Sequence, residues 1–362
     1  MTVIQNQLIG VKESVTDELL LLNPYQTPML NLLGFGEAVT QVEHQWFEDV
    51  MRGTQTTVAT QLEKAVTTLA VADGSIFAPN EVVKVGEELM KVTAVDGNNL
   101  TVVRKYAETA EAVHKVGDAV EFQFVEGVEG ADARKARYKA RVRKSNLTQI
   151  FDATISISET AAATSEYGID DLYEYEKQKK ELELALQLEK AVINGVKYES
   201  SDGLVRQMGG IRQFIKTNVQ DAANGKLTLE MLGDAFQDIF EAGGFEQGGD
   251  YKIVVGAKQK RALSAADADK INISRQENAR GQVVDYFLSD FGGAEIVLNN
   301  NLAPDEVLII DANRIEIKPL QSREFAHKYL GSKGDFIEGQ IVGEYTLLFE
   351  QEQAHARIKG LA

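Results

Sequence analysis

The sequence contains no cysteine, and this absence excludes several kinds of site at once. Disulfide bridges, thiolate zinc sites and cysteine nucleophiles all need that residue. The absence is also compatible with synthesis in a reducing compartment. Only five prolines occur, so no proline-rich linker divides the chain.

Long apolar runs are missing as well. No run of about 18 apolar residues occurs, which predicts that no helix spans a membrane and that the protein has no membrane partner. The first residues, MTVIQNQLIGVKESV, lack a basic segment followed by an apolar core, so we expect no secretory signal.

Motifs of catalysis and of cofactor binding are absent too. The sequence has no G-x-S-x-G elbow and no phosphate-binding loop, and its paired glycines follow no dinucleotide fingerprint. The histidines lie in separate segments without a His-x-x-x-His pair: His44, His114, His327 and His355. We therefore predict no catalytic, cofactor-binding or metal-binding residue, no cofactor and no enzyme activity.

What the chain has in excess is negative charge. Its formal net charge is −17, so its surface should repel nucleic acid on average. One basic run, residues 134–144, has charges at alternate positions from Arg137 to Arg143, which predicts a strand with one basic face. That face could contact nucleic acid or acidic surfaces of neighbouring copies. We favour the second alternative, because no aromatic residues interleave on it as stacking platforms.

Residues 1–40 resemble an arm. A short amphipathic stretch at 11–22 is followed by Pro24 and Pro28, which we expect to stop any helix. The apolar residues 29–33 follow, and the arm alone would leave them poorly buried. The arm packs either on a neighbouring subunit or on its own core, and the sequence leaves both open.

Residues 66–124 differ from the rest in composition. Short runs rich in Val, Leu and Thr are separated by turn signals, such as Asp73-Gly74 and Asp96-Gly97, at intervals of about 8–12 residues. This spacing is typical of a small antiparallel barrel or sandwich. We predict an inserted β domain at about 60–126.

The segment 146–195 combines an alternating strand with a long charged helix, which we place at 169–194. Asp170 and Asp171 suit its first turn, and Gly195 is expected as a C′ glycine. One stripe of the helix is expected to comprise Leu172, Lys179, Leu182, Leu186 and Ile193, with Leu184, Leu188 and Val192 beside it.

The remainder, 200–335, indicates mixed α/β structure. Helices are predicted at 227–242 and 257–268, and strands at 251–255 and in two pieces of 283–298. A hairpin is predicted from 306–311 and 314–319 across Ala312-Asn313, and a mobile loop at 269–282. Near the end, 343–349 alternates as a strand and continues toward 355–357.

Several of these segments together resemble the major capsid (major head) protein of tailed bacteriophages, a family with the Hong Kong 97-type fold. The matching residues of the first segment are Asn146, Thr148, Gln149, Ile150, Phe151, Ser158, Thr160, Ala161, Gly168, Glu189, Asn194 and Gly195. Further matches are Thr27-Pro28, Leu30, Gly34, Gly209-Gly210-Ile211, Thr217-Asn218, Asp290-Phe291-Gly292, 299–304 and 343–347. Their order and spacing, rather than any single motif, carry the resemblance. Residues 60–126 resemble a small β module of phage virion proteins.

The resemblance implies an α+β capsid fold with named parts. These would be an N-terminal arm at 1–40, an extended loop at 41–145 containing the β module, a peripheral domain at 146–205 with the spine helix, a mainly axial domain at 206–335, and a returning C-terminal strand at 336–362.

It also implies a function and partners. The protein would self-assemble, through hexamers and pentamers, into an icosahedral shell around double-stranded phage DNA, without sequence-specific DNA binding. Its location would be the virion capsid, after assembly in the host bacterial cytoplasm. A separate scaffolding protein, a portal and decoration proteins are the expected partners. The alternatives are an encapsulin-like compartment shell, a hydrolytic enzyme and a carbohydrate-binding virion protein.

Some capsids of this fold crosslink a lysine to an asparagine of a neighbour. Lys64, Lys135 or Lys139, together with 299–301, could take those roles. No motif selects them, so we predict no crosslink.

Overall fold

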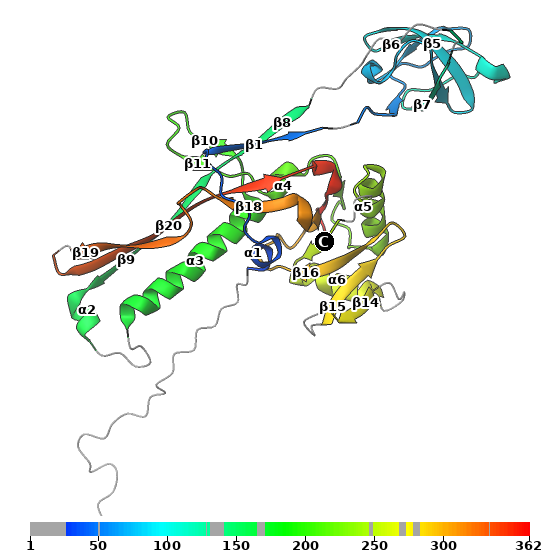
Figure 1. The fold of residues 1–362 in the computed structure, drawn as a ribbon. Helices are drawn as coiled ribbons and strands as arrows, with labels where there is room; N and C mark the ends of the chain where they lie inside the picture. The colour runs from blue at the N-terminus through cyan, green and yellow to red at the C-terminus, as the bar shows by residue number, and fades with distance from the viewer. Residues whose placement is uncertain are drawn as a thin grey trace, which may run out of the picture. The chain divides into compact units, whose positions relative to one another are not determined.

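The structure is a computed structural model, and it describes residues 27–49, 51–127, 129–130, 141–164, 171–245, 249–267, 273–277, 283–332 and 334–362. The chain divides into two compact units, residues 1–46 with 143–362 and residues 47–142 (Figure 1). Within the described residues, no helix has the length and apolar character needed to span a membrane. Of the predicted basic run 134–144, residues 134–140 lie outside the described residues, and Val142, Arg143 and Lys144 belong to strand β8 (Val142–Leu147).

The first unit contains a four-stranded antiparallel sheet built around one long strand. β20 (Phe336–Phe349) pairs with β9 (Gln149–Ser158) on one side, and with β18 (Ile315–Pro319) and β19 (Ala326–Ser332) on the other. The predicted strand at 343–349 is thus only the end of β20. Every residue from 343 to 349 is buried, so this part is covered on both faces.

The spine helix α3 (Leu172–Asn194) lies along β9 and is 23 residues long, about 35 Å. Asp171 is its N-cap and accepts the N–H groups of Tyr173 and Glu174, so the helix begins after the acidic pair rather than at 169. The buried stripe comprises Leu184, Leu188, Glu189, Val192 and Ile193. Leu182, which we placed on the central stripe, is 45% exposed.

The expectation that Gly195 is a C′ glycine is also wrong. Its φ is −54°, so it is not the left-handed C′ glycine of a terminated helix. A Cβ there would lie 2.5 Å from the carbonyl oxygen of Met208. A side chain at position 195 is excluded because the backbone of Met208 approaches closely. The dihedral angles of Gly195 itself would permit one.

The unit also contains a seven-stranded mixed sheet. Its strand order is β12 (Val219–Asp221), β21 (Ala356–Lys359), β17 (Val307–Asp311), β13 (Tyr251–Val255), β16 (Gly293–Leu298), β15 (Val283–Leu288) and β14 (Ile273–Glu277). Helices α5 (Leu229–Glu241) and α6 (Ala257–Asp267) pack on it, and Thr228 caps the first. All five residues of β13 and of β17 are buried, as in central strands.

Two predictions in this region are wrong. The hairpin expected at 306–319 does not form. Its two strands, β17 and β18, do not pair with each other, because they belong to different sheets. A 3₁₀ turn, η5 (Ala312–Arg314), redirects the chain, and β18 pairs with β20 instead. Residues 273–277 of the expected mobile loop form β14, which pairs with β15.

Short elements complete the first unit. They are α1 (Pro28–Leu33), α2 (Glu159–Ala163), α4 (Ile211–Phe214), and the strand pairs β1 (Glu43–Glu48) with β8 (Val142–Leu147) and β10 (Tyr198–Glu199) with β11 (Arg206–Gln207). Pro28 occupies the start of α1, where a proline lacks no hydrogen bond, so it begins a helix rather than stopping one.

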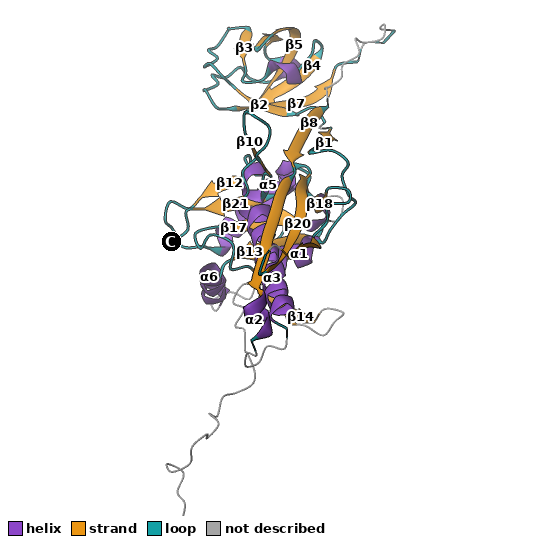
Figure 2. Ribbon diagram, turned by 90° about the vertical axis from the view of Figure 1, so that its left-hand side faces the viewer, coloured by secondary structure: helices purple, strands orange, loops and turns teal. Residues whose placement is uncertain are grey.

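The second unit is a six-stranded sheet (Figure 2). Its order is β2 (Gln55–Thr57), β7 (Ala119–Val125), β4 (Glu81–Val85), β5 (Glu88–Asp96), β6 (Asn99–Val103) and β3 (Thr68–Ala70). The two edges meet, because Ala72 donates its N–H to the oxygen of Thr57 and Ala59 donates to Ala70, each at 2.9 Å. The sheet therefore closes around its own apolar core, which includes Leu69, Met90 and Leu100.

Candidate functional site

Glu189 is fully buried in the C-terminal part of the spine helix, at one of the family-motif positions. Its carboxylate accepts the backbone N–H groups of Met29 and Leu30, at 3.0 and 2.9 Å, and the Nδ2 of Asn299 at 2.6 Å. Burial raises the pKa of the Glu189 carboxyl, and the three donors only partly oppose that shift. This helix latch, Glu189 with Asn299 and the first turn of α1, joins three distant parts of the chain.

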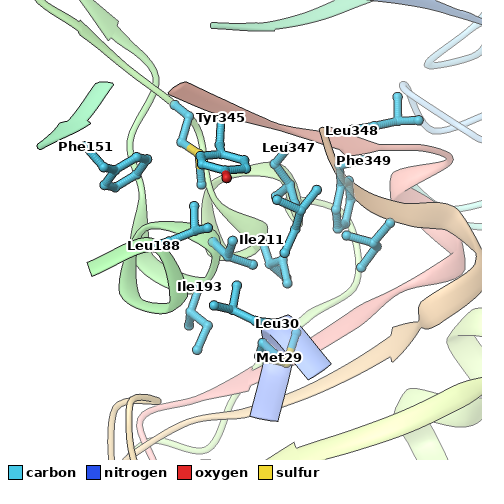
Figure 3. Close-up of a cluster of buried hydrophobic side chains, with 14 of the residues drawn as sticks. Met29, Leu30, Phe151, Leu188, Ile193, Ile211, Tyr345, Leu347, Leu348 and Phe349 are labelled. Atoms are coloured by element: carbon cyan, nitrogen blue, oxygen red, sulfur yellow. The ribbon is translucent and has the colours of Figure 1, made fainter. Parts of the chain in front are cut away.

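The helix latch answers part of the question about the arm. Met29 and Leu30 are buried in the same core as Leu188 and Ile193 (Figure 3). Farther on, Phe35 and Val39 form backbone bridges with Ile317 and Leu320. Residues 27–39 therefore pack on their own subunit. Residues 1–26 lie outside the described residues.

The helix latch also bears on crosslinking. Asn299 has no exposed surface, and its Oδ1 accepts the N–H of Asn301 at 2.8 Å while its Nδ2 is held by Glu189. An amide held in this way is not presented to a lysine of another copy. Lys64 lies in the second unit, and Lys135 and Lys139 lie outside the described residues.

A second buried group, the strand network, surrounds the start of β9. Asn146 donates to the oxygens of Gly209 and Leu347, at 3.0 and 2.8 Å, and accepts the N–H groups of Gly209 and Leu147, at 2.8 and 2.9 Å. Both lone pairs and both protons of its amide are used. Thr346 donates to the oxygen of Leu147 at 2.9 Å. Asn146 thus fixes the Gly209 loop against β8 and β20.

Glu344 supplies the charged part of the strand network. Its Oε1 accepts from the hydroxyl of Thr148 at 2.6 Å and lies 3.3 Å from Arg206, and its Oε2 lies 2.8 Å from Arg323. The carboxylate side chain is only 3% exposed, so these partners are its main solvation. Arg323 is the exposed end of this chain of contacts, at 43%.

The loop after the spine helix closes against the helix end. Gly210 donates its N–H to the oxygen of Gly195 at 2.9 Å. A Cβ on Gly210 would lie 2.6 Å from the nitrogen of Gly195 and 2.7 Å from the oxygen of Ala191. The Gly209-Gly210 motif is therefore a packing requirement.

The histidines serve four separate structural contacts. His114 lies 3.0 Å from Glu88, His327 lies 2.8 Å from the hydroxyl of Tyr173, and His44 lies beside Trp46. Burial lowers the pKa of His355 to about 4, and its Nδ1 accepts the N–H of Asp311 at 3.1 Å. Among the described residues, no group of three or more His, Asp or Glu side chains is placed to hold a metal ion.

Three Glu-x-x-His spacings exist in the sequence: Glu111 to His114, Glu324 to His327 and Glu352 to His355. Among the described residues, none of them belongs to a group of three or more side chains placed to hold a metal ion. Glu111 accepts the N–H of Ala65, and Glu352 accepts the N–H groups of Lys216 and Thr217. The carboxylates of Glu111 and Glu352 therefore stabilise loops by accepting backbone hydrogen bonds.

Large apolar side chains on the surface are the remaining functional feature. In the first unit they include Phe35, Leu204, Tyr329, Leu330, Phe240 and Leu288, and in the second Phe47, Met51 and Phe124. Leu204 is 78% exposed and Met51 is 91% exposed. Exposed apolar groups at many places are expected of a subunit that contacts several neighbours.

Comparison with known proteins shows which family the chain belongs to. Residues 2–362, nearly the whole chain, match the family described as SU10 major capsid protein. The chain belongs to the SU10 major capsid protein family. This capsid-family chain is also 38% identical, over 203 residues, to the major capsid protein of Escherichia phage Phieco32. That match covers 55% of the chain and 52% of the relative, so the chain spans about half the length of the curated relative it matches.

Solved structures show the fold of this capsid-family chain. The capsid of a native GTA particle and the capsid of cyanophage A-1(L) each align with a TM-score of 0.53 at 11% identity. Each alignment covers 99% of this chain and 98% of the other. The chain has a mixed α+β capsid fold of the Hong Kong 97 type, as predicted.

Most residues of the helix latch and of the strand network are motif positions in the sequence. The sequence does not show which residues they contact. The partners Asn299 and Glu344 are 110 and 196 residues from the groups that they bind. One feature of the sequence does indicate the strand network. Glu344 and Thr346 are polar residues inside an apolar strand, and buried polar residues are hydrogen-bonded.

Proposed function

We propose that this protein is the major capsid protein of a tailed bacteriophage head, and that it assembles through hexamers and pentamers into a closed icosahedral shell enclosing double-stranded DNA. The observation that carries the proposal is the family match over residues 2–362. Exposed apolar residues on both units support it, because one copy alone leaves them in contact with water.

The proposal assigns parts to the chain. Residues 1–40 are the N-terminal arm, and 41–145 form the extended loop that carries the six-stranded β module. The peripheral domain is 146–205, with α3 as its spine. The axial domain is mainly 206–335 with the seven-stranded sheet, and 336–362 return to both sheets as β20 and β21.

The partners follow from this role. Copies of the same chain form the shell, a separate scaffolding protein directs its curvature, a portal occupies one vertex, and decoration proteins bind outside. The net charge of −17 supports enclosure of DNA without sequence-specific binding, since carboxylates repel phosphates. The subunit is a component of the virion, assembled in the host cytoplasm.

Expression of the full chain with negative-stain microscopy tests the proposal. Closed particles, tubes or rings of five and six subunits are expected. A monomer at high concentration would contradict it. Nuclease-resistant DNA inside particles purified from infected cells distinguishes a phage head from an encapsulin-like compartment, which would enclose protein cargo.

A further inference from the structure

An exposed region of the seven-stranded sheet has the composition of a protein contact. Phe240, near the end of α5, is 48% exposed, and its ring centroid lies 5.3 Å from that of Phe291. Leu288, the last residue of β15, is 61% exposed and precedes the turn that carries Phe291. Aromatic and aliphatic groups at the centre with polar groups around them are typical of an interface.

The same helix, α5, also carries a row of exposed acidic groups. The outer face of α5 presents four exposed carboxylates and no lysine or arginine, namely those of Glu230, Asp234, Asp238 and Glu241. Their spacing of three and four residues places them along one side of the helix. Within the described part of the chain none of the four has an ion-pair partner. We call these four residues, with Phe240, Phe291 and Leu288, the Phe240 surface.

The helix α6 presents the opposite charge. Lys258 and Arg261 are exposed, three residues apart, and so share a face. Neither forms an ion pair with a residue that the structure describes. Lys260 differs, because its Nζ lies 2.5 Å from a carboxylate oxygen of Asp285.

The two helices are fixed at different places on the sheet (Figure 1). α5 lies against β21. α6 is bound to β15 through Lys260 and Asp285, and Gln259 donates to the oxygen of Pro304 at 2.8 Å. The acidic and basic faces are therefore separate surfaces of one rigid sheet.

We propose that the Phe240 surface of one copy docks against the Lys258–Arg261 face of α6 on a second copy. The inference rests on the proposed function, in which many copies form rings. Two Phe240 surfaces brought face to face would oppose eight carboxylates, four from each copy, whereas the α6 face supplies cations. A contact between two different surfaces is head-to-tail, and head-to-tail contacts that close generate rings.

Charge reversal in the full-length chain tests this contact. One variant carries Asp234→Lys and Glu241→Lys, a second carries Lys258→Glu and Arg261→Glu, and a third combines all four. A matched control carries Glu87→Lys and Asp96→Lys, two exposed acidic positions in the β module. Assembled particles are quantified by sedimentation and negative-stain microscopy, and folding is checked by thermal unfolding.

Each two-residue variant of the helices should lose at least tenfold in assembled fraction while melting like the wild type. The combined variant should recover most of that loss, and the β-module control should assemble normally. The inference is overturned if either two-residue variant assembles like the wild type, or if the folded combined variant fails to recover. If the wild-type chain never assembles, the proposed function itself is contradicted. If the wild-type chain assembles but the variants do not behave as expected, only the proposed contact is contradicted.

Discussion

Glu189 lies in the C-terminal part of the spine helix, away from water, and three protein donors take the place of that water. These hydrogen bonds explain how this chain tolerates a carboxylate on an apolar helix face. The same reasoning applies to Asn146, whose amide uses every donor and acceptor it has. At the scale of single residues, the motif positions hold segments of the chain together.

Removing the Glu189 carboxylate should therefore destabilise the subunit strongly. In Glu189→Ala, the N–H groups of Met29 and Leu30 and the Nδ2 of Asn299 lose their acceptor, at about 1–3 kcal/mol each. We expect the free energy of unfolding to fall by roughly 3 kcal/mol or more in denaturant titrations. Glu189→Gln keeps one acceptor oxygen and should lose less. Equal stability of the alanine variant and the wild type would show that the helix latch is dispensable.

His355 should make the subunit sensitive to acid. Its pKa is lowered by burial to about 4, whereas an unfolded histidine titrates near 6.5. Between these values the unfolded chain binds the extra proton, so stability falls as pH falls from 6.5 toward 4. The full effect is about 3 kcal/mol, from the difference between the two pKa values. The groups facing the ring are Asp311, Arg314 and Glu352, together with the oxygen of Glu350.

Thermal or denaturant unfolding of the wild type and of His355→Gln, measured from pH 7 to pH 4, isolates this contribution. The difference in unfolding free energy between the two proteins should change steadily across that range. A difference that stays constant with pH would mean that His355 has the same pKa in the folded and unfolded chain.

At the scale of elements, the spine helix and the Gly209-Gly210 loop meet so closely that side chains are excluded between them. Gly210→Ala would place a Cβ within 2.6–2.8 Å of three backbone atoms, which cannot move independently. We expect a loss of roughly 2 kcal/mol or more, as for an overpacked core. Gly233→Ala in α5 is the matched control, because nothing lies within 4 Å of its Cβ position, and it should stabilise the helix by about 0.5–1 kcal/mol. Melting temperatures of the two variants should therefore move in opposite directions.

The elements also show what the sequence can specify. Periodic segments were predictable: β13 has the predicted bounds, and α5 and α6 begin or end within two residues of them. The pairing of β18 with β20, rather than with β17, was not predictable, because it joins residues 26 to 34 positions apart, from Pro319–Tyr345 to Ile315–Phe349, and depends on a 3₁₀ turn. The contact of Glu189 with Met29 and that of Thr148 with Glu344 likewise join residues more than 100 positions apart. Local patterns carry no information about such partners.

At the scale of the whole molecule, the two units have separate cores. The β module has its own buried cluster and a closed sheet, and a buried ion pair joins Arg104 to Glu88 at 2.7 Å. Burial opposes ionisation of Glu88, yet hydrogen bonds from Arg104, Ala112 and His114 lower its pKa to about 2. This carboxylate should stay ionised in mildly acidic solution, so the module should resist acid better than the His355 region.

A fragment of residues 51–127 should consequently fold alone. We expect a cooperative thermal transition and a β-type circular dichroism spectrum, both retained at pH 4.5. The same fragment with Leu100→Ala, which removes a fully buried side chain, should melt lower by several degrees. A wild-type fragment without a cooperative transition would show that the module depends on the remainder of the chain.

The pairing of β1 with β8 has a consequence for how such a chain can change over time. The chain leaves the first unit along β1 and returns along β8, so the two ends of the β module are attached to neighbouring strands. A domain with adjacent ends can be lost, gained or exchanged through one short stretch of gene without altering the register of either sheet in the first unit. The β1–β8 pair is thus an attachment point at which such a chain can acquire a new surface while the sheets of its first unit stay the same.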